Sequence, residues 1–203
     1  MWKTTPMLIL ASKSSARAAL LAGAGIRFET CPATIDERAV EAAALGKGIG
    51  PPNVARALAE AKALDVARAK PGALVVGADQ VLALGAELQH KPKDMAEAAL
   101  QLQRLRGRVH HLHAGVALAR DANLIWSDVE TAELVMRNFS ADERDRVLAL
   151  EGDAILGSVG AYRLEGPSIR LFEQIRGDYF TVLGLPLLPL LAALRSYAPQ
   201  LLR

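Results

Sequence analysis

A continuous apolar run from Ala73 to Ala78 constrains the fold of this chain more than any other segment. The run ends at Asp79 and is typical of a central strand, because a strand covered on both faces does not alternate apolar and polar residues. A second short run, Leu8 to Ala11, has the same character and predicts another buried strand. The chain is therefore expected to be an α/β protein with helices covering its sheet.

The rest of the sequence predicts helices and strands that follow one another without strict alternation. Helices are expected at about residues 14–23, 54–70, 95–106, 141–150 and 187–197, and further strands at 26–31, 80–84, 87–88, 110–120, 124–138, 158–164 and 169–175. Asn53 is expected to cap the second helix, Asp94 the third, and Ser140 the fourth through a capping box with Glu143. Residues 42–52, rich in Gly, Ala and Pro, are expected to form a mobile connection. This order indicates a mixed sheet with helices on its faces, not a pure Rossmann repeat.

Length and charge limit the classes of protein that this chain can belong to. Its 203 residues, of which 51% are hydrophobic, suit one compact domain or one domain with two lobes. The 24 Lys and Arg residues against 22 Asp and Glu are too balanced for a protein that binds nucleic acid through bulk charge. A few cations can still hold a small anionic substrate. The single cysteine, Cys31, rules out an internal disulfide framework.

Neither end of the chain predicts secretion or a membrane anchor. Met1 to Pro6 is interpreted as a short polar leader without the apolar core of a signal peptide. The most apolar run, Val182 to Leu194, contains two prolines and is too short to span a membrane. We interpret it as a core helix that could also contribute to a contact between subunits. A cytoplasmic protein with no membrane partner is expected.

The segment after the first apolar run combines hydroxyls and cations at the start of a helix. Ser12, Ser14 and Ser15 can donate hydroxyl hydrogen bonds. Lys13 and Arg17 add full positive charges, and free backbone N–H groups at a helix N-terminus also favour an anion. The segment predicts an anion site, although an ordinary capped helix with solvated cations has the same local pattern.

Two groups of carboxylates are candidates for metal binding or acid–base chemistry. Asp79 directly follows a buried strand, where ligands of open α/β sheets gather, so it can bind a metal or activate water. Asp36 and Glu37 form a second acidic pair in an expected loop. Two such groups suit Mg²⁺ or Mn²⁺ that keeps several waters and binds substrate phosphates. The alternatives are a turn aspartate and a solvated loop pair.

Other polar residues are weaker candidates. Lys91 precedes a proline that stiffens its loop, and a stiff loop can direct the lysine ammonium towards a phosphate. The simpler interpretation is a surface lysine. Lys62, in the helix before the central strand, has the same two readings. His110, His111 and His113 have no acidic neighbour in sequence, and we interpret them as strand-face residues and not as metal ligands.

Taken in order, these pieces resemble the motifs of Maf-like nucleotide pyrophosphatases from Leu8 to about Leu194. The motifs are Leu8-Ile9-Leu10-Ala11-Ser12-x-Ser14 with Arg17, Asp36-Glu37, Leu58-Ala59-x-x-Lys62-Ala63, Gly77-Ala78-Asp79-Gln80-Val81, Lys91-Pro92, Gly107-Arg108-x-His110, Gly160-Ala161-Tyr162, Glu165-Gly166 and Gly184-Leu185-Pro186-Leu187. Each motif is weak alone, but their order and spacing together are highly specific.

The resemblance implies a fold and a reaction. The fold would be a Maf/inosine-triphosphatase-like two-lobed mixed sheet with flanking helices and a central cleft, with residues 1–203 forming a single domain. The reaction would be hydrolysis of a nucleoside triphosphate to the monophosphate and pyrophosphate with a divalent metal, Mg²⁺ or Mn²⁺. Many such proteins are homodimers, so a homodimer is also expected.

The resemblance also implies roles for individual residues. Asp79 matches the family's proposed general base, and Glu37 matches a metal-linked carboxylate; whether Asp79 acts mainly as base or as metal ligand stays open. The positions that match phosphate-binding residues are Ser12, Ser14, Arg17, Lys62 and Lys91.

Three positions bear on the choice of substrate. Gln80 and Glu165 resemble the branch that prefers 7-methyl-GTP, and a carboxylate can accept hydrogen bonds from the N1–H and N2–H₂ edge of guanine. Ala16 offers neither charge nor an aromatic face to the base. A modified or non-standard nucleotide, 7-methyl-GTP or a related purine, is therefore predicted. The alternatives are pyrimidine triphosphates such as dTTP and UTP, or a nucleotide-binding regulator of cell division with little turnover.

Overall fold

The computed structural model describes residues 7–203, so the expected polar leader, Met1–Pro6, lies outside the described residues. The described chain divides into two compact units. The first unit contains the residues up to 80 together with 113–130 and 178–203, and the second contains 81–112 and 131–177. Each unit is described below by itself.

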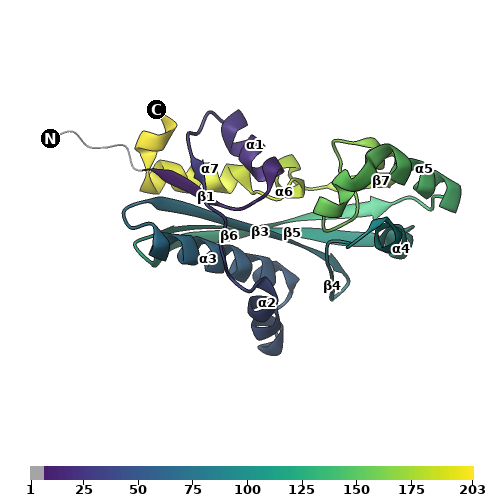
Figure 1. Cartoon of the computed structure of the whole chain (residues 1–203), viewed down its shortest axis with the longest axis horizontal. Coiled ribbons are helices and arrows are strands. Elements are labelled where there is room, and N and C mark those ends of the chain that lie inside the picture. The colour runs from purple at the N-terminus through teal and green to yellow at the C-terminus, as the bar shows by residue number, and fades with distance from the viewer. Residues whose placement is uncertain (1–6) are drawn as a thin grey trace. The chain divides into compact units, whose positions relative to one another are not determined.

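The described residues form a seven-stranded mixed sheet with helices, which confirms the predicted fold class (Figure 1). The elements are β1 (Leu8–Ala11), α1 (Ser15–Gly23), β2 (Glu29–Thr30), α2 (Glu37–Gly46), α3 (Pro51–Ala69), β3 (Leu74–Leu84), β4 (Glu87–Gln89), α4 (Met95–Leu105), β5 (Val109–Arg120), β6 (Asn123–Met136), α5 (Ala141–Glu151), η1 (Gly152–Gly157), η2 (Pro167–Leu171), β7 (Phe172–Arg176), α6 (Tyr179–Val182), α7 (Leu187–Tyr197) and η3 (Pro199–Leu202). The strand order is β2-β1-β3-β5-β6-β7, with β4 paired to β3. Strand β1 is parallel to β2 and β3, whereas the β3–β4 and β6–β7 pairs are antiparallel.

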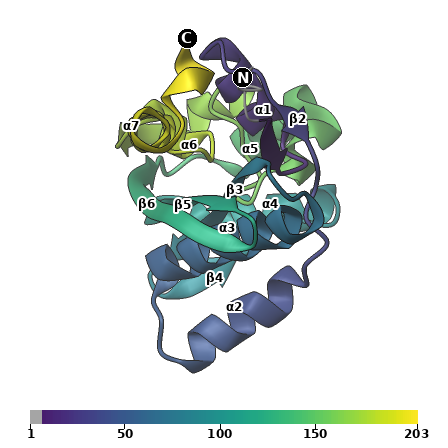
Figure 2. The ribbon, with the colours of Figure 1, turned by 90° about the vertical axis from the view of Figure 1, so that its left-hand side faces the viewer.

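In the first unit, helices cover both faces of the sheet. Because successive side chains of a strand point to opposite faces, Leu8 and Leu10 pack with α1 and α7, while Ile9 packs with α3. Figure 2 shows α1 and α7 on one side of these strands and α3 on the other, with α2 beyond α3. Residues 187–194 of the run predicted as a core helix lie in α7, whereas residues 182–186 precede that helix. Leu190 and Leu194 of α7 are fully buried.

Helix α3 lies unusually close to β3. A Cβ atom added at Gly77 would lie 2.6 Å from the backbone nitrogen of Ala63 and would also clash with the carbonyl oxygen of Ala59. Only a glycine on the strand, facing alanines on the helix, allows this approach. The close approach brings Lys62, which neighbours Ala63 on α3, to the part of β3 that carries Asp79.

Two predictions about the α2–α3 region are wrong. Residues 37–46 form helix α2, so the connection expected over residues 42–52 is helical over much of its length, as its alanines favour. Helix α3 begins at Pro51 with Gly50 as N-cap, and Asn53 lies inside the helix. Proline suits the first helical turn because its fixed φ is compatible with the helix and its missing N–H is not needed there.

Strand β3 differs from its prediction in a way that matters for function. It continues through Asp79 to Leu84, so Asp79 lies within a long strand and does not end one. The sequence pattern broke at the polar pair Asp79-Gln80, but the strand continues and pairs with β4 through Leu84 and Glu87. This pairing confirms the strands predicted at 80–84 and 87–88, which form a hairpin around Gly85.

Other predicted elements are confirmed or corrected in part. Strand β2 contains only residues 29–30 of the expected 26–31, and no strand forms over the described residues 158–164. The expected strand at 169–175 is β7, preceded by a 3-10 turn. The strands expected at 110–120 and 124–138 are confirmed as β5 and β6, and Asp121 and Ala122 have positive φ, as the tight turn between them requires.

The second unit is built around α4 and α5, which pack against each other. Both helices have the predicted N-caps: the carboxylate of Asp94 accepts a hydrogen bond from the backbone nitrogen of Glu97, and the hydroxyl of Ser140 accepts one from Glu143. Over the part of the chain that the structure describes, no helix is both long and apolar enough to cross a membrane.

Candidate active site

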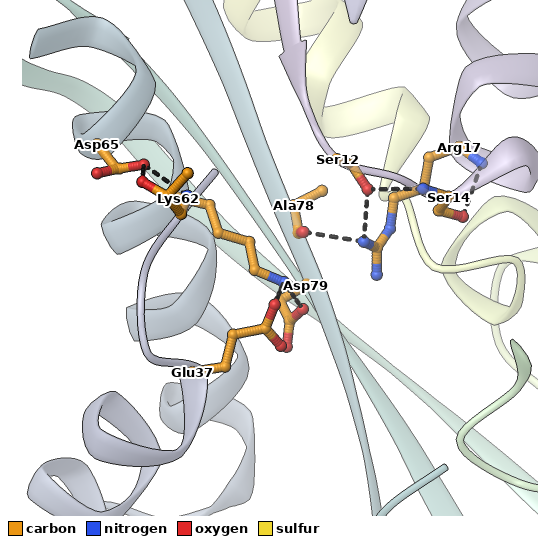
Figure 3. Close-up of polar contacts among 9 residues, drawn as sticks. Ser12, Ser14, Arg17, Glu37, Lys62, Asp65, Ala78 and Asp79 are labelled. Carbon is orange, nitrogen blue, oxygen red and sulfur yellow. Dashed lines mark hydrogen bonds and ion pairs between the residues drawn. The ribbon is translucent and has the colours of Figure 1, made fainter. Parts of the chain in front are cut away.

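In the first unit, a lysine side chain lies between two carboxylates. The Nζ atom of Lys62 lies 2.5 Å from Oδ1 of Asp79 and 2.9 Å from Oε1 of Glu37 (Figure 3). Lys62 and Asp79 are buried, whereas the side chain of Glu37 is 56% exposed. The two carboxylates therefore approach one point from different elements, one buried and one open to solvent.

Local structure explains how Glu37 reaches this point. Glu37 is the first residue of α2 and does not lie in the expected loop, because Asp36 caps that helix and accepts a hydrogen bond from the backbone nitrogen of Ala39 at 3.1 Å. The segment before it is tied to α3, since the backbone nitrogen of Thr34 donates to Oδ2 of Asp65 at 2.8 Å. A carboxylate in the first turn is also favoured by the helix dipole.

The predicted anion site is organised around Arg17. Its Nη1 donates to the hydroxyl of Ser12 at 3.1 Å and to the carbonyl of Ala78 at 3.0 Å, and its Nε donates to the carbonyl of Gly184 at 2.7 Å. Ser14 caps α1 by accepting from the backbone nitrogen of Arg17. These hydrogen bonds fix the guanidinium plane. They use the N–H groups of Nε and Nη1, so the two N–H groups of Nη2 can donate to an anion.

Electrostatics couples the arginine to the carboxylates. Burial lowers the pKa of Arg17 from its ordinary value, while the charges of Asp79 and Glu37 act in the opposite direction and raise it. A guanidinium keeps its charge near neutral pH even when partly desolvated. The first unit therefore holds two fixed cations, Arg17 and Lys62, beside two carboxylates, which is a suitable arrangement for a ligand with both phosphate groups and a metal.

Gln80 makes contacts that its predicted role did not anticipate. Its Nε2 donates to the carbonyls of Thr181 and Val182, both at 3.0 Å, which ties β3 to α6. Two residues further on, Gly184 has φ +89°, and an added Cβ would lie 3.4 Å from Nε of Arg17 and 3.5 Å from Cδ of Gln80. The turn after α6 thus holds Gln80 and Arg17 together, and the amide nitrogen of Gln80 is already used there.

The structure brings some predicted site residues together but not all. Those that gather in the first unit are Ser12, Ser14, Arg17, Glu37, Lys62, Asp79 and Gln80. Ala16 lies in the first turn of α1 in the same unit. Lys91 is exposed in the segment between β4 and α4, and Glu165 is exposed before η2; both belong to the second unit.

The donor set suits a hard divalent cation bound together with a phosphate. Among residues 7–203, no group of three or more His, Cys, Asp or Glu side chains is placed to hold a metal ion. Asp79 and Glu37 nevertheless supply two carboxylates around one point, already occupied by the ammonium of Lys62. Mg²⁺ is commonly held by one or two carboxylates plus substrate phosphates, so these residues fit such an ion and not a closed protein cage.

Two contributors to the site escaped the sequence interpretation. Asp65 anchors the segment before Glu37, and its position three residues after Lys62 on α3 was a usable signal, because residues at this spacing are neighbours on a helix. Gly184 belongs to a motif found in the sequence, but the hydrogen bond from Arg17 to its carbonyl was not predicted, because a backbone oxygen gives no side-chain signal.

The fold and the site together define an α/β protein whose fixed cations and carboxylates suit a phosphate-bearing ligand. The chain belongs to the Maf-like protein family, whose family model matches residues 7–197. This confirms the family predicted from the sequence motifs.

Close relatives are similar to this chain over almost their whole length. The 7-methyl-GTP pyrophosphatase of Brucella abortus biovar 1 (strain 9-941) is 54% identical over 191 residues, which cover 94% of this chain and 96% of that protein. The 7-methyl-GTP pyrophosphatase of Rhizobium meliloti (strain 1021) is 53% identical over 191 residues, with the same coverage. The nucleoside triphosphate pyrophosphatase of Bradyrhizobium diazoefficiens is 50% identical over 196 residues, which cover 97% and 96% of the two chains.

Proposed function

We propose that this Maf-like protein hydrolyses a nucleoside triphosphate to the monophosphate and pyrophosphate, and that 7-methyl-GTP is its preferred substrate. The observation that carries the proposal is the ammonium of Lys62 shared by Asp79 and Glu37, with Arg17 coupled to the same carboxylates. The names of relatives at 50–54% identity support the same reaction. They also confirm the predicted enzyme class, a hydrolase acting on triphosphate anhydrides.

The chemistry requires an in-line water and a neutralised leaving group. In the proposed reaction the water oxygen bonds to the α-phosphorus, the α–β anhydride P–O bond breaks, and pyrophosphate leaves. Asp79 orients the water and accepts its proton at a carboxylate oxygen, while Lys62 holds the Asp79 side chain in place through its contact with Oδ1. Arg17, Ser12 and Lys62 bind the phosphates and stabilise the charge that develops on the leaving group.

Asp79 and Glu37 are the residues that would hold a divalent cation, Mg²⁺ or Mn²⁺, together with the phosphates. Such an ion supplies charge neutralisation and polarises the phosphoryl oxygens. Lys62 then has two functions: it keeps the two carboxylates together before the substrate arrives, and it binds phosphate afterwards. Lys91 is assigned to phosphate binding by its motif alone.

The base preference rests on Glu165. Its carboxylate is exposed, and a carboxylate can accept from both the N1–H and the N2–H₂ groups of guanine. Methylation at N7 makes the purine ring cationic, which a carboxylate also favours. We further propose, from the family resemblance, that the two units act as one Maf-like domain and that the protein is a cytoplasmic homodimer; its mass in solution by light scattering tests the dimer.

The test is a panel of triphosphates with Mg²⁺ or Mn²⁺ and detection of pyrophosphate. Wild-type protein is expected to release pyrophosphate from 7-methyl-GTP faster than from GTP, dTTP or UTP. Asp79→Asn should abolish release with the fold retained, while Asp145→Asn, at an exposed aspartate on α5, serves as the matched control. Full activity in Asp79→Asn would remove its assigned role, and tight binding without turnover in wild-type protein would favour a regulator instead.

A further inference from the structure

Glu165 lies in a tight turn that no sheet pairing holds in place. The backbone nitrogen of Gly166 donates to the carbonyl of Arg163 at 3.2 Å, which closes a four-residue turn with Glu165 at its third position. The turn lies within the second unit, between η1 and η2. Something other than a strand ladder must therefore fix the direction of the Glu165 carboxylate.

The buried carboxylate of Glu151 is the group that does so. Glu151 is the last residue of α5, and its side chain is completely buried. Its Oε2 accepts from Nε and Nη2 of Arg163 at 2.9 and 2.8 Å. Its Oε1 accepts from the backbone nitrogen and the hydroxyl of Ser168 at 2.8 and 2.7 Å. Four hydrogen bonds thus reach one carboxylate from both sides of the turn.

The protonation state of Glu151 follows from these contacts. Burial acts to raise its pKa, but the hydrogen bonds from Ser168 and the ion pair with Arg163 outweigh burial and lower the pKa of Glu151 below its ordinary value. The group is therefore a buried carboxylate anion at neutral pH. Such a group is costly unless it is fully paired, so each of its donors is held firmly.

The backbone of the turn also rests directly on this carboxylate. A Cβ atom added at Gly166 would lie 2.6 Å from Oε1 and 3.0 Å from Oε2 of Glu151, so no side chain fits between them. Arg163 and Gly166 are the first and last residues of the turn. Glu151 therefore contacts the turn on either side of Glu165 and leaves Glu165 itself exposed.

The segment leading into the turn is anchored in a similar way. The hydroxyl of Tyr162 lies 2.9 Å from Nε2 of His110, and Nε2 of Gln101 donates to the carbonyl of Val159 at 2.5 Å. The ring of Tyr162 also packs edge-on against Phe172, with centroids 4.9 Å apart. These contacts limit the motion of the turn from its N-terminal side.

We propose that Glu151 is a positioning residue for nucleobase recognition, which fixes the Arg163–Gly166 turn so that Glu165 is presented to the guanine edge. The inference rests on the proposed function, in which Glu165 contacts the base. A buried ion pair contributes little net stability compared with an apolar replacement, but it specifies one geometry. An acceptor that is already in place loses less entropy on binding, so Glu151 should affect base selectivity more than turnover.

The experiment compares matched glutamate-to-glutamine variants in the full-length protein. Glu151→Gln keeps the size of the side chain but removes its charge, and Glu165→Gln removes the proposed base contact. Glu143→Gln is the control, since Glu143 lies on the same helix in an exposed ion pair with Arg137 at 2.7 Å. For each variant, kcat and KM are measured with 7-methyl-GTP and with UTP, and thermal unfolding is recorded.

Glu151→Gln is expected to raise KM for 7-methyl-GTP about tenfold, with kcat and the UTP parameters changed less than about twofold. The double variant with Glu165→Gln should lose no more selectivity than Glu165→Gln alone, because both act through the same contact. Ser168→Ala removes only one donor to Glu151 and is expected to shift selectivity in the same direction by about threefold. It keeps the test open if Glu151→Gln does not fold.

The possible results separate the inference from the proposed function. Wild-type selectivity in both Glu151→Gln and Ser168→Ala overturns the positioning role and leaves that of Glu165 intact. An equal loss on both nucleotides also overturns it, because it indicates general damage. Unchanged selectivity in Glu165→Gln overturns the base contact and the positioning role together. If wild-type protein releases no pyrophosphate from any triphosphate, the proposed function falls, and the inference with it.

Discussion

The close packing of α3 on β3 predicts a large effect from a very small change, Gly77→Ala. The added Cβ would lie 2.6 Å from the Ala63 nitrogen, about 0.4 Å inside the 3.0 Å limit of real Cβ contacts, and closer still to the Ala59 carbonyl. Both are backbone atoms, so no side-chain rotation relieves the clash and α3 must move away from β3. Overpacking of this kind costs about 1–3 kcal/mol of unfolding free energy.

The same movement would separate Lys62 from Asp79, which are now 2.5 Å apart on α3 and β3. Misplacing a catalytic group by about 1 Å can cost about 100-fold in rate, so we expect Gly77→Ala to lose roughly 10- to 100-fold in kcat/KM. Urea denaturation followed by circular dichroism measures the stability, and pyrophosphate release measures the activity.

The control is Gly23→Ala, at the end of α1, where an added Cβ meets nothing within 4 Å. This variant is expected to keep wild-type activity and to be as stable as the wild type or slightly more so. Adding Ala63→Gly to Gly77→Ala should restore little, because the contact with the Ala59 carbonyl remains. If Gly77→Ala has wild-type stability and activity, the argument that glycine is needed for this helix–strand contact is refuted.

Two other substitutions test the charges of the chain. Glu37→Gln removes an exposed partner of Lys62, so the unfolding free energy should change by less than about 1 kcal/mol. The Mn²⁺ concentration for half-maximal pyrophosphate release should rise about tenfold. Unchanged metal dependence would exclude Glu37 from the metal site. Burial lowers the pKa of His110 from 6.5 to about 4, so the unfolded chain takes up its proton first as the pH falls. The folded protein therefore loses up to about 3 kcal/mol of unfolding free energy through His110 as the pH falls from above 6.5 towards 4. In urea denaturation at pH 7 and 4.5, His110→Phe should therefore lose less stability on acidification than wild-type protein, and equal losses would contradict this.

Local sequence patterns predicted the elements that local physics determines. The buried strand at residues 8–11 and the caps Asp94 and Ser140 were found as expected, because a cap requires only a side chain and a nearby backbone N–H. Asp79 shows where this approach ends. A polar pair in the sequence looked like the end of a strand, but neighbouring strands continue to supply hydrogen bonds beyond it.

The candidate site depended on contacts between residues distant in sequence. Lys62 and Asp79 are separated by 17 residues, and their meeting follows from the fit of α3 against Gly77, which no hydrophobic pattern reveals. Family motifs named both residues but not their direct contact. Gln80 was assigned to substrate choice, yet its amide nitrogen bonds two backbone carbonyls, a contact that depends on where α6 lies.

The way Arg17 is held has a consequence for how this protein tolerates sequence drift. Two of its three acceptors are the main-chain oxygens of Ala78 and Gly184, which every substitution leaves chemically present. Only the Ser12 hydroxyl can be deleted by a single codon change. A mutation at Ala78 can displace the guanidinium only by moving the backbone, whereas a side chain at Gly184 would also crowd it, because an added Cβ there lies 3.4 Å from Nε of Arg17. The orientation of this cation is therefore encoded mainly by chain path, and it should outlast considerable divergence in the surrounding side chains.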